Sequence, residues 1–192
     1  TSDLTVIEAD EYDRSFLHLS PYMAVITSAD PDHLDIYDTS DAYRDSFESF
    51  TSLIRRGGAL LLKKGVDITP KLQEGVLLYT YSGEEQADFY AENIQIDKGE
   101  LRFDFVSHNH KRIDGLQLGV PVMINVENAV AAIAIALMNG ASEKEIRAGI
   151  ASYQGVKRRF DIQLKTDRVV FIDDYAHHPA EIKASISSVK EL

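Results

Sequence analysis

The sequence contains no cysteine among its 192 residues. Disulfides and thiolate metal sites are therefore excluded, and this absence favours a reducing cytosol without requiring one. Basic residues are in the minority, because 20 Lys and Arg stand against 31 Asp and Glu, which gives a formal charge of −11 at pH 7. Such a chain is a poor partner for nucleic acid or for an anionic membrane surface. Any anionic ligand must therefore be bound by basic side chains that lie close together.

Long apolar runs are absent as well. The longest strongly apolar run, residues 129–138, falls far short of the roughly 20 residues needed to span a bilayer. No charged and then apolar leader opens the chain, so no secretory signal is expected. The hydrophobic fraction of 44% and the charged fraction of 27% are ordinary for a soluble protein. We expect a cytoplasmic protein that is folded throughout.

Strand-like and helix-like segments alternate in the first eighty residues. Between residues 40 and 56, apolar positions recur at steps of three and four, and Gly57 and Gly58 end the run, which predicts an amphipathic helix. Short apolar or β-branched runs predict buried strands at residues 4–8, 22–27, 59–62 and 76–81. This alternation is typical of α/β proteins.

The pattern changes after residue 88. Apolar runs at 89–96 and 101–106 flank a tetrapeptide in which Gly99 can supply a positive φ, so an antiparallel hairpin is expected. A polar turn at 108–111 precedes a further strand at 113–118.

The last third of the sequence predicts helices and one strand. A helix is expected at 126–138, and Ser142 with Glu145 forms a capping box for a second helix that reaches about residue 152. A basic connector follows at 155–160. Residues 169–173 read as a strand, and Pro179 suits the first turn of a closing helix.

An acidic run follows the first predicted strand. Four carboxylates lie within residues 8–13, from Glu8 to Asp13. At the carboxyl end of a strand such residues would face a crevice, and a bound cation relieves their mutual repulsion. A solvated acidic loop is the alternative, but the strand directly before the run favours a functional role.

A second polar run, Asp-Pro-Asp-His-Leu-Asp at residues 30–35, follows the next predicted strand. Its oxygen donors and the imidazole of His33 suit a metal ion. Spacing alone favours a transition metal, because Mg²⁺ prefers oxygen ligands and imidazole is the softer donor. Helix capping by Asp30 or Asp32, with His33 exposed, is the alternative.

Two further motifs lie in the second half of the sequence. Asn125 and Asn128, three residues apart at the start of an Ala-rich helix, could read a base edge or cap the helix. The connector Lys-Arg-Arg-Phe at 157–160 offers cations suited to phosphate. The string Asp-Asp-Tyr-Ala-His-His-Pro at 173–179 places carboxylates and two histidines at the end of a strand.

These four motifs, in this order, resemble those of the Mur ligase family, most closely of its members that join L-alanine to UDP-N-acetylmuramate. The resemblance covers nearly the whole chain. It implies an α/β fold: the later part of a central ATP-binding domain, with a mostly parallel sheet flanked by helices plus an antiparallel hairpin, over residues 1–160. Residues 161–192 would begin a Rossmann-like C-terminal domain that binds the amino acid. A Gly-Lys-Thr phosphate loop does not occur in the sequence, so this stretch is expected to be inactive alone.

The resemblance also implies roles for individual residues. Arg159 would face the phosphates of ATP, and His177 and His178 would lie close to the interdomain cleft, so these three are the expected catalytic residues. The other ligand contacts implied are Glu8 and His33 to Mg²⁺, Asn125 and Asn128 to adenine, and Asp174 to ribose. Family members commonly place His directly before the first Asn, where this chain has Ile124.

The implied reaction has two steps. ATP phosphorylates the lactyl carboxylate of UDP-N-acetylmuramate, and the amine of L-alanine then displaces phosphate to form an amide. Two alternatives stay open: a recycling ligase that attaches a preformed tripeptide to the same sugar, and a non-catalytic nucleotide-binding module.

Overall fold

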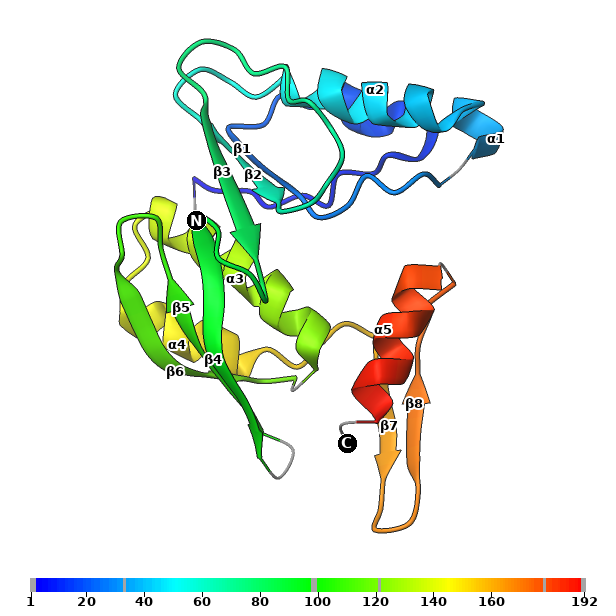
Figure 1. Cartoon of the computed structure of the whole chain (residues 1–192), viewed down its shortest axis with the longest axis vertical. Coiled ribbons are helices and arrows are strands. Elements are labelled where there is room, and N and C mark those ends of the chain that lie inside the picture. The colour runs from blue at the N-terminus through cyan, green and yellow to red at the C-terminus, as the bar shows by residue number, and fades with distance from the viewer. Residues whose placement is uncertain (1–2, 33, 98–99, 121, 178, 191–192) are drawn as a thin grey trace. The chain divides into compact units, whose positions relative to one another are not determined.

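A computed structural model of the chain describes all residues except 1–2, 33, 98–99, 121, 178 and 191–192 (Figure 1). The chain divides into two compact units, residues 1–80 and 81–192. Strand β3 (Leu77–Ser82) begins in the first unit and ends in the second. The expected α/β class, a mostly parallel sheet with helices and an antiparallel hairpin, is confirmed. None of the described helices is long and apolar enough to cross a membrane.

The first unit is built on a β-α-β crossover. Strands β1 (Met23–Ile26) and β2 (Ala59–Lys63) are parallel, and β2 is followed in the sheet by β3. Between β1 and β2 the chain forms α1 (Leu34–Tyr37) and α2 (Ser40–Thr51). The 3-10 segment η1 (Tyr12–His18) comes before β1. The strands predicted here at 22–27, 59–62 and 76–81 are confirmed.

Helix α2 begins where the sequence predicts and ends five residues earlier. The Oγ1 of Thr39 accepts the N–H of Ala42 at 3.1 Å and caps the helix. At the other end, the N–H of Arg55 donates to the carbonyl of Pro21 at 2.9 Å. Because that donor is used outside the helix, the i to i−4 ladder cannot continue to residue 56.

Aromatic side chains form the core of the first unit. Phe16 of η1 stacks on Phe50 of α2 with ring centroids 5.0 Å apart, and Tyr37 of α1 meets Tyr43 of α2 edge-on at 4.8 Å. All four side chains are buried. Pairs of this kind contribute about 0.5–1.5 kcal/mol beyond their buried area, so they hold η1 and α1 against α2.

The second unit contains an antiparallel meander covered by two helices. Strand β4 (Phe89–Asp97) is parallel to the end of β3 and antiparallel to β5 (Glu100–Val106), which pairs with β6 (Arg112–Leu118). Helices α3 (Met123–Met138) and α4 (Glu143–Ser152) pack on β4 and β6 (Figure 1). The predicted hairpin and the capping box of Ser142 are confirmed, and α3 starts three residues before its predicted start. Gly99 lies outside the described residues.

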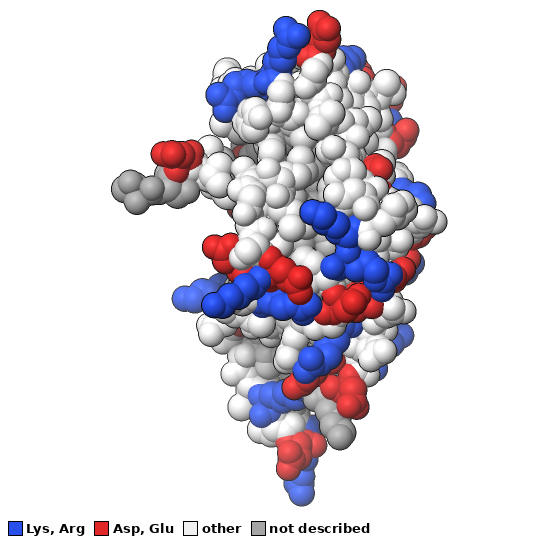
Figure 2. Space-filling view, turned by 90° about the vertical axis from the view of Figure 1, so that its left-hand side faces the viewer, with Lys and Arg blue, Asp and Glu red and all other residues white. Residues whose placement is uncertain are grey.

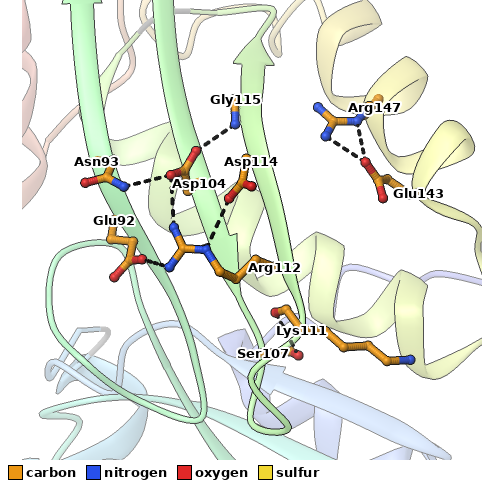
Figure 3. A network of polar contacts seen from close by, with 10 residues as sticks. All are labelled: Glu92, Asn93, Asp104, Ser107, Lys111, Arg112, Asp114, Gly115, Glu143 and Arg147. Carbon is orange, nitrogen blue, oxygen red and sulfur yellow. Dashed lines mark hydrogen bonds and ion pairs between the residues drawn. The ribbon is translucent and has the colours of Figure 1, made fainter.

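A carboxylate on the open face of this sheet joins three strands (Figure 3). Asp104 accepts hydrogen bonds from the side chain of Asn93 at 2.8 Å, the N–H of Gly115 at 2.7 Å and a terminal nitrogen of Arg112 at 3.1 Å. Asn93 and Gly115 have positive φ angles of 52° and 61°, and both lie where the strand register shifts. Asp104 therefore holds two irregular backbone positions at once.

Charges of both signs lie side by side on the surface. On the face drawn in Figure 2, Lys and Arg side chains lie among Asp and Glu side chains, so this face carries no broad patch of one sign. Exposed ion pairs between such neighbouring charges contribute little stability each.

The end of the chain forms a small separate sheet. Strands β7 (Asp161–Lys165) and β8 (Val170–Asp173) pair antiparallel, and α5 (Pro179–Val189) follows. The predicted strand at 169–173 and the helix opened by Pro179 are confirmed, whereas β7 was not predicted. The domain boundary expected between residues 160 and 161 stays a prediction. The division of the chain into two compact units falls elsewhere, between residues 80 and 81.

The strand predicted at residues 4–8 is wrong for this structure. Residues 4–10 form no helix or strand, and Leu4, Val6 and Ile7 are 60%, 95% and 62% exposed. Apolar alternation produces a buried strand only where a neighbouring strand and a covering layer are present. Among the described residues, the sheet begins at β1 and does not include this segment.

Candidate nucleotide-binding site

A groove of about 480 Å³ runs between α3 and α4. Small residues line much of it, including Ala129, Ala132 and Ala136 on α3 and Gly149 on α4. Polar groups also border it, among them Asn125 and Asn128 from the first turns of α3 and Glu145 of α4. An apolar groove of this volume with a few polar groups is typical of a small-molecule site.

A backbone contact sets the separation of β6 and α4 beside the groove. The N–H of Gly119 donates to the carbonyl of Ile150 at 3.1 Å. A Cβ at position 119 would lie 2.0 Å from the carbonyl oxygen of Tyr153, which lines the groove. Since no side chain fits there, glycine is required for the two segments to approach this closely.

The two asparagines border the groove but do not cap the helix. The side chain of Asn125 donates to the carbonyl of Val120 at 3.4 Å, and that of Asn128 donates to Asn125 at 3.5 Å. The residue at the N-cap, Val122, makes no side-chain capping bond. Both bonds are long, and the amide of Asn128 is exposed. The capping alternative is therefore not supported, and the amides can turn to a ligand at little cost.

The basic connector is held against Tyr175. The guanidinium carbons of Arg158 and Arg159 lie 4.6 and 5.7 Å from the centre of that ring. The N–H of Tyr175 donates to the carbonyl of Arg158 at 2.7 Å, and Phe160 is buried, 7% exposed. Arg159 also donates to a carboxylate oxygen of Glu181 at 3.1 Å. Phe160 thus anchors the connector, and both guanidinium groups remain close to one aromatic ring.

The strand end after β8 is tied to α5. Asp174 accepts the N–H of Ala176 at 3.2 Å with one oxygen and the hydroxyl of Ser185 with the other. His177 approaches the carbonyl of Tyr175 through Nδ1 at 3.1 Å. Helix α5 in turn contacts α3, which carries the two asparagines. His178 lies outside the described residues.

Sequence reasoning missed the contribution of α5. Glu181 and Ser185 bind Arg159 and Asp174, residues that the motifs had singled out. Their spacing of four residues on a predicted helix was the available signal, because such residues share a face. The contact between that face and the connector 22 residues away could not be read from spacing.

The two acidic motifs of the first unit approach the same pair of tyrosines. The hydroxyl of buried Tyr37 donates to the carbonyl of Glu11. Burial raises the pKa of Tyr43 far above its ordinary value, and the charges of Glu11, Asp32 and Asp30 raise it further. The structure therefore brings residues 8–13 and 30–35 near each other, although they are separated by β1.

Of the two expected metal ligands, Glu8 lies in the described part of the chain. Glu8 is exposed in the segment without helix or strand, and His33 lies outside the described residues. Among residues 3–32, 34–97, 100–120, 122–177 and 179–190, no group of three or more His, Cys, Asp or Glu side chains is placed to hold a metal ion. Metal binding by Glu8 and His33 stays a prediction.

The chain is similar to known proteins along its whole length. A UDP-N-acetylmuramate–L-alanine ligase from Parabacteroides distasonis is 65% identical over 192 residues, which are 100% of this chain and 41% of the relative. The chain spans about two-fifths of the length of the curated relatives it matches.

Solved structures share the fold. The crystal structure of a UDP-N-acetylmuramate-alanine ligase from Thermotoga maritima matches with a TM-score of 0.78 and 28% identity, over 95% of this chain and 41% of that one. The MurF ligase from Thermotoga maritima in complex with ADP matches with a TM-score of 0.74 over 92% of this chain and 42% of that one. At 15% identity, this second match shows the fold alone. A family model described as the Mur ligase middle domain matches residues 1–136 of the 192, so the chain belongs to the Mur ligase family.

Proposed function

We propose that this chain is part of an ATP-dependent ligase of peptidoglycan precursor synthesis that joins L-alanine to UDP-N-acetylmuramate. The observation that carries the proposal is the 65% identity, along the whole chain, to a relative with that name. The reaction would pass through an acyl phosphate of the sugar's lactyl carboxylate, which the amine of L-alanine attacks. Residues 1–160 would belong to the central ATP-binding domain and 161–192 to the C-terminal domain.

The groove between α3 and α4 is the proposed adenine site. Its apolar walls suit a flat aromatic ring, and the exposed amide of Asn128 can pair with a base edge that offers both a donor and an acceptor, as adenine does. Asn125 would support Asn128 through their mutual contact. The nearby Ile124, 44% exposed, replaces a common family histidine and cannot donate a hydrogen bond to the base.

The connector and the strand end would bind the rest of the nucleotide. Arg159 is proposed to donate to the phosphates, because only some of its five N–H groups are used by Glu181. Asp174 is proposed to accept a hydrogen bond from a ribose hydroxyl. One of its oxygens must then give up the hydrogen bond from the hydroxyl of Ser185 or from the N–H of Ala176.

Charge neutralisation is the main demand of phosphoryl transfer. Glu8 and His33 are proposed to hold Mg²⁺, which supplies electrostatic stabilisation of the transferring phosphoryl group when bound. Carboxylates of both acidic motifs act on Tyr43, and a cation bound among them would relieve their mutual repulsion. His177 and His178 would lie at the cleft where the sugar carboxylate and the amine meet. We place the ligase in the cytoplasm, where ATP is available.

Phosphate release by the full-length protein tests the proposal. Release should require ATP, UDP-N-acetylmuramate and L-alanine together, and mass spectrometry should detect the UDP-N-acetylmuramoyl-L-alanine product. Release with the preformed tripeptide but not with L-alanine would instead identify a recycling ligase. ATP binding without any amide product would identify a nucleotide-binding module.

A further inference from the structure

One face of α5 contacts three residues of the proposed nucleotide site. Glu181 and Ser185 are four residues apart, so their side chains lie on the same side of the helix. Ser185 donates to Asp174. One oxygen of Glu181 accepts from Arg159 at 3.1 Å, and the other accepts the backbone N–H of His177 at 3.1 Å. The carboxylate of Glu181 thus links the connector to the strand end.

Two contacts restrict the guanidinium of Arg159. The ring of Tyr175 lies 5.7 Å from its central carbon, and a carboxylate oxygen of Glu181 accepts a hydrogen bond from Nη1. The side chain is otherwise free to sample solvent, since 51% of its surface is exposed. An arginine has five N–H donors in a fixed plane, so binding of Glu181 at Nη1 leaves donors for an oxyanion in the same plane. Holding a side chain in its binding orientation lowers the entropic cost of ligand binding.

We propose that Glu181 is a positioning residue that orients Arg159 toward the phosphates of the nucleotide. The inference rests on the function proposed above, which places phosphate at Arg159. A purely structural role is the competing explanation, because Glu181 lies in the first turn of α5 and its bond to the N–H of His177 resembles a helix cap. That role is local to α5 and does not require Arg159.

Binding of ATP and of adenosine to the full-length ligase separates the two explanations. Glu181→Ala should weaken ATP binding about two- to fivefold, the range for the loss of an exposed ion pair. Adenosine binding should stay unchanged, because adenosine carries no phosphate. When Glu181→Ala is added to Arg159→Ala, no further loss is expected, since residues that act through one another are not additive. Isothermal titration calorimetry in the presence of Mg²⁺ measures both affinities. The four proteins compared are the unaltered ligase, Glu181→Ala, Arg159→Ala and the double variant.

Two further variants complete the experiment. Glu143→Ala is the matched control, because Glu143 also lies in the first turn of its helix, α4, and pairs with an arginine, Arg147, at 2.7 Å (Figure 3). It should leave ATP affinity unchanged. Glu181→Gln keeps the shape and one acceptor, so it should bind ATP with an affinity between those of the unaltered protein and Glu181→Ala. This variant also gives an answer if Glu181→Ala does not fold.

Several results would overturn the positioning role. These are equal weakening for ATP and adenosine, an additive loss in the double variant, or unchanged ATP affinity in both Glu181 variants. If Arg159→Ala binds ATP normally, no phosphate contact exists for Glu181 to organise, and the role is likewise refuted. Failure of the proposed function is a different outcome, because it is read from amide formation by the unaltered protein and not from nucleotide affinity.

Discussion

Replacing Asp104 by alanine should destabilise the second unit by about 2–3 kcal/mol. The side chain is 16% exposed and accepts from Asn93, Gly115 and Arg112. A hydrogen bond contributes about 0.5–1.5 kcal/mol, and one to a charged group contributes more. The exposed ion pair with Arg112 adds only about 0.2–1 kcal/mol. Two positive-φ positions would also lose the group that holds them.

Thermal unfolding of the 192-residue chain, followed by circular dichroism, measures the effect. A loss of this size should lower the unfolding midpoint by roughly 5–10 °C for a chain of this length. The control is Asp114→Ala, because Asp114 contacts Arg112 at 3.2 Å but its side chain is 71% exposed. That change should cost less than about 0.5 kcal/mol. Equal shifts for the two variants would show that Asp104 is an ordinary surface charge.

The pH dependence of this difference gives a second check. Partial burial raises the pKa of Asp104, but hydrogen bonds from Asn93 and Gly115 and the charge of Arg112 outweigh burial and hold the pKa below its ordinary value. A lowered pKa in the folded state adds stability that is complete above the unfolded value of about 3.9 and is lost as pH falls through the folded value. The unaltered protein should therefore be more stable than Asp104→Asn by the full amount at pH 7, and this difference in stability should shrink in acid. A difference that does not change with pH would refute the reasoning.

Three further predictions concern the proposed nucleotide and metal sites in the full-length ligase. Glu8→Ala or His33→Ala should lower turnover at least about 100-fold through loss of a metal ligand, and near-normal rates at saturating Mg²⁺ would reject the assignment. Arg159→Lys should cost roughly 10- to 150-fold in rate, because an ammonium cannot donate as a planar fork, whereas Arg158→Lys should cost less than about threefold. Kinetics with ATP varied decide this, and a larger loss at Arg158 would show that the wrong arginine was chosen. Ala132→Phe should fill the groove and weaken ATP binding at least about 10-fold. The unfolding midpoint should stay unchanged, because Ala132 is exposed. An unchanged ATP affinity would place adenine elsewhere.

Local patterns in the sequence predicted most elements of the fold. The strands at 59–62 and 101–106 follow from short apolar runs, and the capping box of Ser142 and Glu145 marks the start of α4. The segment at 4–8 failed because burial depends on what covers a run, and not on the run alone. Strand β7 was missed although Ile162 and Leu164 alternate with polar residues, because a run of five residues carries only two apolar positions.

The candidate site was predicted in its parts but not in its connections. The sequence motifs identified Arg159, Asp174 and the two asparagines, and the structure places them on a connector, a strand end and the lining of a groove. The bonds from Glu181 and Ser185 of α5 join residues that are 22 and 11 positions apart. Contacts over such separations depend on how strands and helices pack, which periodicity and spacing do not report.

The close approach at Gly119 limits how the groove can change during evolution or engineering. Because the backbone of Tyr153 occupies the space of any side chain at position 119, substitution there would displace a main-chain segment. Ala132 and Ala136 are not buried in the core, and larger residues at these two positions would enter the groove from α3. Selectivity for a ligand can therefore be altered by single substitutions on one helix while the scaffold beneath stays the same. At the proposed adenine site, such substitutions would change the shape of the groove that the base meets.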